Sequence, residues 1–358
     1  MGSEMCIRDS IDAMGAMAQG LFCSLLIGTI INAMGLLFDI RALKIVVATV
    51  GGIKYTVGGL AMAMSGPAMA VAIGRALHCP PLVLYSLLTV GFATNALGGA
   101  GGPLAVLFVA IATSEIGKLA AGETKVDILV TPLVTIGVGA TLAALCAPPL
   151  GKLAMQTGTV IMWATELQPF LMGILVSVFV GIALTLPISS AAICAALGLT
   201  GLAGGAAVAG CSAQMIGFAV QSYRENGVGG LLSQGLGTSM LQMPNIVKNP
   251  RIWLPAILAS AVTGPLATCF FKLEMNGDPI NSGMGTCGLC GQLGVWTGWV
   301  NPSDAALANG AAAMAPTAFD WVGLILISFV LPAALTWAFG LFFRKIGWIK
   351  PGDLTLPQ

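Results

Sequence analysis

The side chains best suited to chemistry in this chain are uncharged hydrogen-bonding groups set among glycines. The first such segment, 94–103, carries an amide at Asn95 and a run of glycines ending at Pro103. A glycine-rich break exposes main-chain N–H and C=O groups, and an amide side chain both donates and accepts. This combination suits a neutral polyhydroxylated ligand. The candidate binding residues of this segment are Asn95, Gly98, Gly99, Gly101 and Gly102.

Two further segments have the same character. Residues 276–292 are too rich in glycine to form a regular helix at low cost, so they predict a re-entrant loop that lines a cavity. Residues 242–251 join two apolar runs, and their amides lie closer to the apolar run than Lys248 and Arg251, which suit the headgroup level. The candidates from both segments are Gln242, Asn245, Asn281, Gly285, Thr286 and Gln292.

Gln214 is the best lone polar candidate inside a long apolar run, with hydrogen-bonded helix–helix packing as the alternative role. Catalytic and metal sites are not indicated. His78 is the only histidine, so a zinc site at Cys287 and Cys290 lacks two further ligands. We interpret these cysteines as inert small residues in a tight loop, and we expect no cofactor. There is no P-loop ending, and a net charge of +1 without a basic patch gives no sign of nucleic acid.

The elements that must position these groups are membrane segments. Residues 167–223 form a run of 57 positions without Asp, Glu, Lys, Arg or His. Such a run is best solvated by lipid, since one span takes about 20 apolar residues. The chain is 57% hydrophobic and 8% charged, against roughly 25% charged in soluble domains. The sequence therefore predicts an all-α polytopic integral membrane protein with about ten spanning or re-entrant segments.

Several of these segments are broken by Pro and Gly within the apolar run, as at 65–67, 102–103 and 264–265. Broken helices in lipid must be satisfied by protein or by a water-filled cavity, which favours a transporter core over a simple anchor. The sequence at 102–108 is echoed at 264–270, which favours an internal repeat, with chance matches as the alternative.

We expect one membrane domain over 11–358, preceded at 1–10 by a cloning scar or read-through artefact. Arg344, Lys345 and Lys350 follow the last apolar run and predict a cytoplasmic C-terminus. The basic loops at 39–44 and 248–251 share that side in this interpretation. The acidic loop at 272–278 faces outward.

Three segments carry a resemblance to a known family. Residues 95–105, 243–253 and 283–291 resemble membrane proteins of the perfringolysin-regulator type, which are classed with enzyme IIC of the sugar phosphotransferase system. The resemblance runs through the chain after residue 11. It implies a homodimeric sugar permease of the bacterial inner membrane that works with separate IIA and IIB phosphocarrier proteins. The Gly-Ile-Thr-Glu motif of glucose-type IIC proteins is absent.

The leading hypothesis is a IIC-type permease for a small polar solute, a sugar or sugar derivative, working by alternating access in a dimer. The alternative is a membrane sensor or regulator that binds such a ligand without translocating it. An enzyme in its own right is disfavoured, because no nucleophile–base pair is visible in the sequence.

Overall fold

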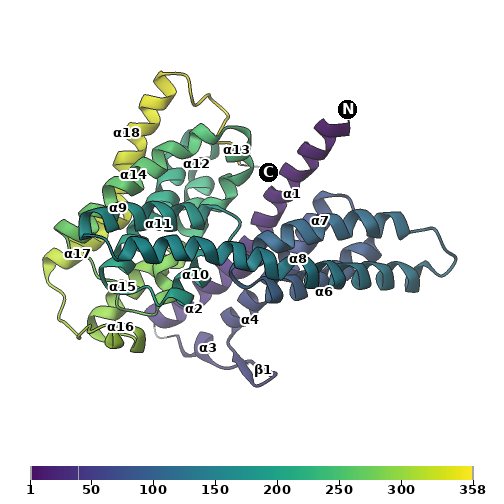
Figure 1. The fold of residues 1–358 in the computed structure, drawn as a ribbon, viewed down its shortest axis with the longest axis horizontal. Coiled ribbons are helices and arrows are strands. Elements are labelled where there is room, and N and C mark those ends of the chain that lie inside the picture. Colours follow the sequence, from purple (N-terminus) through teal and green to yellow (C-terminus); the bar gives the residue numbers. More distant parts are fainter. Residues whose placement is uncertain (1, 39, 357–358) are drawn as a thin grey trace. The chain divides into compact units, whose positions relative to one another are not determined.

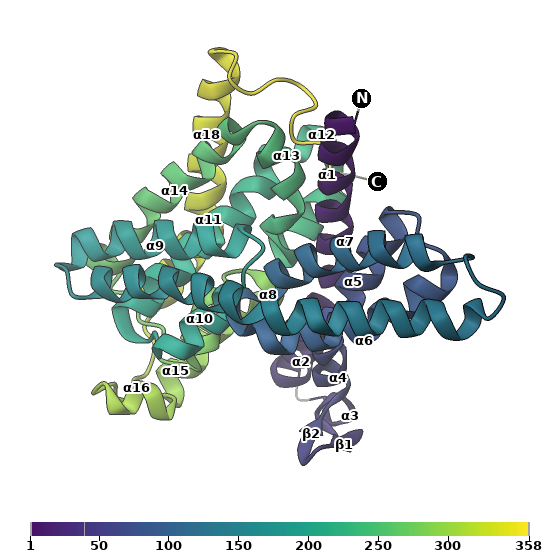
Figure 2. The same ribbon diagram turned by 45° about the vertical axis from the view of Figure 1, so that its right-hand side comes forward.

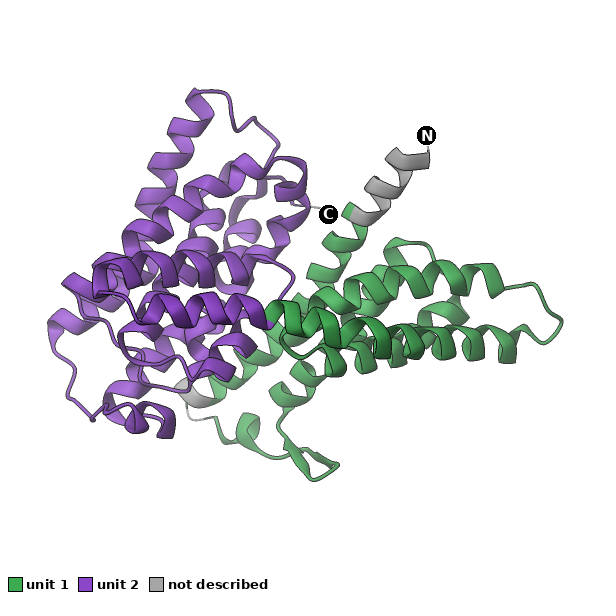
Figure 3. Ribbon diagram, viewed as in Figure 1, with its two compact units in different colours: residues 1–154 green, residues 155–358 purple. Residues whose placement is uncertain are grey.

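The computed structural model describes residues 2–38 and 40–356, and the side chains of residues 2–10, 36 and 37 lie outside its described part. The predicted scar at 1–10 therefore stays a prediction. The chain divides into two compact units, Met1–Ala154 and Met155–Gln358, which Figure 3 shows in two colours. Each unit has buried apolar packing of its own, around Val90 and Val109 in the first and around Phe218 and Ile252 in the second.

The first unit is a helical bundle with one small β-hairpin, a minor exception to the all-α prediction. Its long helices include α6, α7 and α8, which can be followed in Figure 1. Helix α8 continues into the second unit. The elements are α1 (Gly2–Leu21), α2 (Ile27–Leu37), α3 (Arg41–Lys44), β1 (Ala48–Val50), β2 (Ile53–Tyr55), α4 (Val57–Ala63), α5 (Ser65–Ala76), α6 (Pro81–Gly98), α7 (Gly102–Ala120) and α8 (Asp127–Thr165). Strands β1 and β2 pair antiparallel, with Thr49 opposite Lys54.

Helices α6 and α7 fold back on each other through the glycine-rich run. The short turn Gly99–Gly101 joins them, and Gly99 has a φ of 51° that an L side chain rarely adopts. Near the turn Gly98 faces Ala105, and at the far ends Gly117 faces Val83, so the two helices are antiparallel. The predicted break is thus the tip of a helical hairpin.

The second unit contains most of the broken segments. Its helices are α9 (Pro169–Thr185), α10 (Ser190–Leu197), α11 (Gly201–Gln221), α12 (Tyr223–Leu232), α13 (Met243–Lys248), α14 (Leu254–Pro265), α15 (Cys290–Val300), α16 (Asp304–Ala308), α17 (Ala318–Ile325) and α18 (Leu331–Lys345). Short irregular turns interrupt them, including η3 (Ser233–Gly237), η4 (Ser239–Gln242), η7 (Pro279–Gly283) and η8 (Cys287–Leu289).

Helix α11 is the buried axis of this unit and packs against α9, α14 and α18 (Figure 2). Gly181 of α9 faces Gly210, and Thr185 contacts Gln214 four residues further on, so α9 and α11 run parallel. Helix α14 runs the opposite way, since Gln221 contacts Ile252 whereas Gln214 contacts Ser260.

In the described part of the chain, six helical segments are long and apolar enough to span a membrane, or seven if the bent pair α4 and α5 forms one span. One of the six, Pro81–Ala120, includes the α6–α7 hairpin. The polytopic membrane fold is therefore confirmed, whereas the expected total of about ten spanning or re-entrant segments is not. The difference lies in short pieces such as α10 and α15, which fall below span length.

Charges in the second unit separate between its two ends. The start of α14 lies beside the end of α11, and the end of α18 contacts the same residue, Gln221. That end carries Arg224, Lys248, Arg251, Arg344, Lys345 and Lys350 with Glu225 and Asp353. At the other end, Gly201 pairs with Met275 and Phe271 lies against Phe319. Its charges are Glu166, Lys272, Glu274, Asp278, Asp304 and Asp320.

Candidate functional site

The candidate site lies around the middle of α11, at Cys211–Met215, where three irregular segments converge. The first segment is the connection between α9 and α11. Because these two helices are parallel, the chain between them must return across the unit, and α10 is part of that return. The second segment is 233–242, comprising η3 and η4. The third is the glycine-rich loop 279–292, part of the segment 276–292 for which the sequence predicts a re-entrant loop.

The loop 279–292 is held against α11 by close backbone packing. Gly285 has a φ of 54°, and a Cβ at this position would lie 2.6 Å from Cys211 Cβ. Thr286 is fully buried; its Oγ1 donates to the carbonyl oxygen of Gly235 at 2.5 Å and lies 3.6 Å from Met215 Sδ. Leu289 adopts a left-handed conformation with a φ of 61°. Such strain in a non-glycine residue persists only where the surrounding packing fixes it.

Gln292 is the polar side chain with an open hydrogen-bonding position in this cluster. Its Nε2 donates to Ser212 Oγ at 3.3 Å, whereas its Oε1 is buried without a partner among the described residues. On the same loop, Gly283 accepts a hydrogen bond of 2.7 Å from Ser190 Oγ at the start of α10. A buried acceptor without a donor is costly, so Gln292 Oε1 marks a place where a ligand hydroxyl would be favourable. Asn281 is half-buried on the same loop.

Gln214 serves as a junction between helices. Its Oε1 accepts from Trp253 Nε1 at 2.8 Å and from Thr185 Oγ1 at 3.3 Å, and its Nε2 donates to Ser260 Oγ at 3.4 Å. Thr185 also lies 2.8 Å from Ser239 Oγ of the second returning segment. These bonds match the packing role that the sequence left as the alternative for Gln214.

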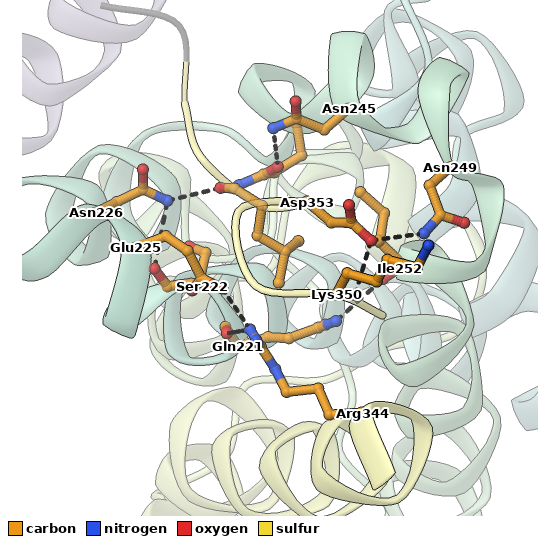
Figure 4. Close-up of polar contacts among 12 residues, drawn as sticks. Gln221, Ser222, Glu225, Asn226, Asn245, Asn249, Ile252, Arg344, Lys350 and Asp353 are labelled. Carbon is orange, nitrogen blue, oxygen red and sulfur yellow. Dashed lines mark hydrogen bonds and ion pairs between the residues drawn. The ribbon is translucent and has the colours of Figure 1, made fainter. Parts of the chain in front are cut away.

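Gln242 and Asn245 contact the C-terminal segment of the chain. Gln242 Nε2 donates to the carbonyl oxygen of Leu354 at 2.9 Å, and Asn245 Nδ2 donates to that of Thr355 at 2.8 Å. Asn226 adds a donor to Leu354 and an acceptor for the main-chain N–H of Leu356, both at 2.8 Å. Figure 4 shows part of this amide cluster. The structure therefore groups these two predicted residues with the C-terminal segment instead of with the loop 279–292.

The remaining predicted residues lie in the first unit, at the tip of the α6–α7 hairpin. Asn95 Nδ2 donates to Ser65 Oγ at 3.3 Å, and the Asn95 side chain packs directly against Gly102. Gly98 and Gly101 lie against the backbone of α8, at Gly151 and Leu150 respectively. Gly99 is exposed. The small residues of this segment thus allow close helix approach and leave Asn95 half-buried at the turn.

The two cysteines of the loop are chemically quiet. Cys287 is buried and Cys290 is half-buried, and structural cysteines in such surroundings are inert. Among the described residues, no group of three or more His, Cys, Asp or Glu side chains could hold a metal ion. The arrangement therefore offers a ligand uncharged hydrogen-bond donors and acceptors.

Sequence reasoning missed several members of the cluster. Ser190, Ser212 and Ser239 are buried and belong to it, but small hydroxyl residues also pack helices and gave no separate signal. It also missed the ion pair of Glu225 and Arg344, whose Oε1 and Nη2 are 2.9 Å apart. These residues are 119 positions apart. They meet because α11 and α18 pack parallel, with Gly217 against Thr336 and Gln221 against Gly340.

The comparisons agree with the architecture. The family described as phosphotransferase system, EIIC, matches residues 11–356. No curated protein and no solved structure matches the chain. The expected resemblance to enzyme IIC is confirmed, whereas the perfringolysin-regulator type is not. With its apolar helices and a match over nearly its whole length, the chain belongs to the EIIC family of the phosphotransferase system, the membrane permease component of sugar uptake.

Proposed function

We propose that the protein is a homodimeric permease that moves a sugar or sugar derivative across the bacterial inner membrane by alternating access. The observation that carries this proposal is the convergence of three irregular segments on the buried middle of α11. Irregular backbone at membrane depth is tolerated only where it is enclosed by protein or lines a cavity. In secondary transporters such broken elements form the solute site. We treat residues 11–358 as a single permease domain.

The proposed solute contacts are Thr286, Gln292, Ser212 and Asn281, with main-chain groups of the loop around Gly285. Gln292 is the key residue in this proposal, because its buried Oε1 has no donor among the described residues. A sugar hydroxyl would supply that donor. Gln242, Asn245 and the turn at Asn95 remain candidate contacts for a second stage of the transport cycle.

Gln214 supports this site from behind. Three neighbours already use its oxygen and nitrogen atoms, so we assign it to positioning the helices. Gln292, by contrast, has an oxygen without a partner among the described residues, so we assign Gln292 to solute binding and Gln214 to helix packing. Leucine at 214 would leave the indole N–H of Trp253 without its acceptor. Leucine at 292 would leave only Ser212 without its partner.

We further propose that the basic end of the second unit faces the cytoplasm, which also places the C-terminus there. Lys and Arg concentrate at that end, whereas Asp and Glu dominate the other, in accord with the positive-inside rule. Separate IIA and IIB proteins would deliver phosphate to the sugar from this side. In this proposal the chain binds and orients the sugar, and it contributes no catalytic side chain.

The test is counterflow in proteoliposomes with a panel of labelled sugars, sugar acids, polyols and ascorbate. We expect Gln292→Leu and Thr286→Val to lose counterflow of the active solute while eluting normally in detergent. The matched control is Thr297→Val on the same helix as Gln292, where the exposed hydroxyl bonds only to its own helix. Normal counterflow in both site variants would refute the site.

Thermal shift with the same panel separates the permease from a regulator. A ligand at 100 times its dissociation constant stabilises the folded protein by about 2.7 kcal/mol. A permease shows both this shift and counterflow. Binding without counterflow of the same solute would refute transport and support a membrane sensor that uses the same site.

A further inference from the structure

A second pocket lies at the basic end of the second unit, apart from the proposed sugar site. It is a cavity of about 240 Å³ between the end of α11, the start of α12 and the last turns of α18. Its walls combine apolar, aromatic and cationic side chains. The residues that matter for the argument are Gln221, Tyr223, Arg224, Thr336, Trp337 and Arg344.

Two residues of the pocket wall each carry a buried polar atom without a partner among the described residues. The atoms are Gln221 Oε1 and Thr336 Oγ1, in side chains that are 6% and 0% exposed. The amide nitrogen of Gln221 is occupied, because it donates to the carbonyl oxygen of Ile252 at 3.3 Å (Figure 4). An acceptor and a hydroxyl that both lack partners call for a ligand that itself carries hydroxyl groups.

Two arginines add positive charge to the same walls. Arg344 is anchored, because its Nη2 donates to Glu225 Oε1 at 2.9 Å and to the carbonyl oxygen of Gln221 at 3.1 Å. Glu225 balances that charge but is not part of the lining. Arg224 is exposed at the rim and has no ion pair among the described residues, so the pocket keeps a net positive charge. Guanidinium groups are well suited to phosphate oxygens.

The pocket lies where two candidate membrane spans end. Helices α11 and α18 belong to candidate spans that end at Gln221 and Lys345, and the pocket lies beside both ends. Trp337 and Tyr223 are 55% and 48% exposed. Trp and Tyr at such positions mark the membrane–water interface. Anionic lipids of the cytoplasmic leaflet attract basic residues there.

We propose that this pocket binds a phosphate ester that carries free hydroxyl groups. Arg224 and Arg344 hold the phosphate, and Gln221 Oε1 and Thr336 Oγ1 bond the hydroxyls. Two sources have this chemistry: a glycerol-type phospholipid headgroup in the bilayer, and a soluble sugar or glycerol phosphate. The exposed Trp337 and Leu341 beside the rim favour the lipid source. The proposal is independent of the sugar site around α11.

The test measures binding to the purified full chain by native mass spectrometry and microscale thermophoresis. One arm compares phosphatidylglycerol with phosphatidylcholine in mixed micelles, and the other uses soluble glycerol 3-phosphate. Arg224→Gln should weaken the preferred probe about tenfold, the usual scale of a charge-assisted hydrogen bond. Thr336→Val, which keeps the shape and removes the hydroxyl, should weaken it about fivefold.

Lys345→Gln is the matched control, because it removes the same charge from an exposed position next to Arg344 that does not line the pocket. It should leave binding within about twofold of wild type. Preference for phosphatidylglycerol identifies the lipid source, and binding of glycerol 3-phosphate identifies the soluble one. Binding of neither probe, or equal losses in Arg224→Gln and Lys345→Gln, would overturn the proposal.

Discussion

Replacing Arg344 by glutamine should lower the free energy of unfolding by about 3 kcal/mol, because it strands a buried carboxylate. The Glu225 side chain is 9% exposed, and its Oε1 accepts from Arg344 at 2.9 Å. Its Oε2 is buried without a partner among the described residues. Losing one partner of a buried pair typically costs about 3–5 kcal/mol. We place this pair at the lower end, since Arg344 is 19% exposed and water can reach the site.

The reverse substitution should be milder. Glu225→Gln removes the charge that is more deeply buried, and Arg344 keeps its hydrogen bond to the carbonyl oxygen of Gln221. We expect a loss of about 1 kcal/mol, the usual size of one lost hydrogen bond. Independent effects would add to about 4 kcal/mol in the double variant. We expect the double variant to lose only about 1–2 kcal/mol, because it strands no charge.

The assay is reversible unfolding in mixed detergent micelles with increasing dodecyl sulfate, followed by tryptophan fluorescence. Lys345→Gln serves as the control, since it removes an exposed cation from the same helix turn. If Arg344→Gln is no more destabilising than this control, the carboxylate is not held as a buried ion. Strict additivity in the double variant would contradict the coupling of the pair.

Two further predictions follow from packing and hydrogen bonding. Gly205→Ala should lower the melting temperature sharply in a fluorescence-based melt, because its Cβ would overlap the carbonyl oxygen of Leu273; an unchanged melt would contradict this packing. Asn226→Ala should speed hydrogen exchange at Leu356 about tenfold, because it removes the acceptor of that N–H and a donor to Leu354; unchanged exchange would show that this contact does not hold the segment.

The membrane class was predictable because it depends on the length of charge-free runs, which can be counted in the sequence. A charge-free run of 57 residues cannot be covered by water-facing surfaces, and α9, α10 and α11 all fall within it. The break at Gly98–Gly102 was also predictable, since glycine disfavours a helix interior. That the break turns α7 back along α6 depends on the contact between Val83 and Gly117, which no local pattern encodes.

The candidate site was predictable only in its residue types. An amide side chain in an apolar run needs hydrogen-bond partners. The hydroxyls of a solute and main-chain carbonyl groups can supply them equally well. The side-chain amides of Gln242 and Asn245 donate to the carbonyl oxygens of Leu354 and Thr355, which lie more than 100 positions further along the chain. Thr286 and Gln292 were predicted from their own loop, whereas their partners on α11 and at Gly235 required the three-dimensional packing.

The separation of charge from the middle of α11 bears on how such a site would select a ligand. Cys211–Met215 are buried, and their polar contacts are with amides, hydroxyls, a sulfur atom and main-chain groups. A charged side chain there would require a partner of opposite sign, and the described charges of this unit lie at its two ends. A neutral site can hold a sugar and release it without breaking a strong ion pair. Selectivity would then depend on whether the hydroxyls of the ligand reach Gln292 Oε1 and the strained backbone around Leu289, both fixed by the packing of the loop on α11.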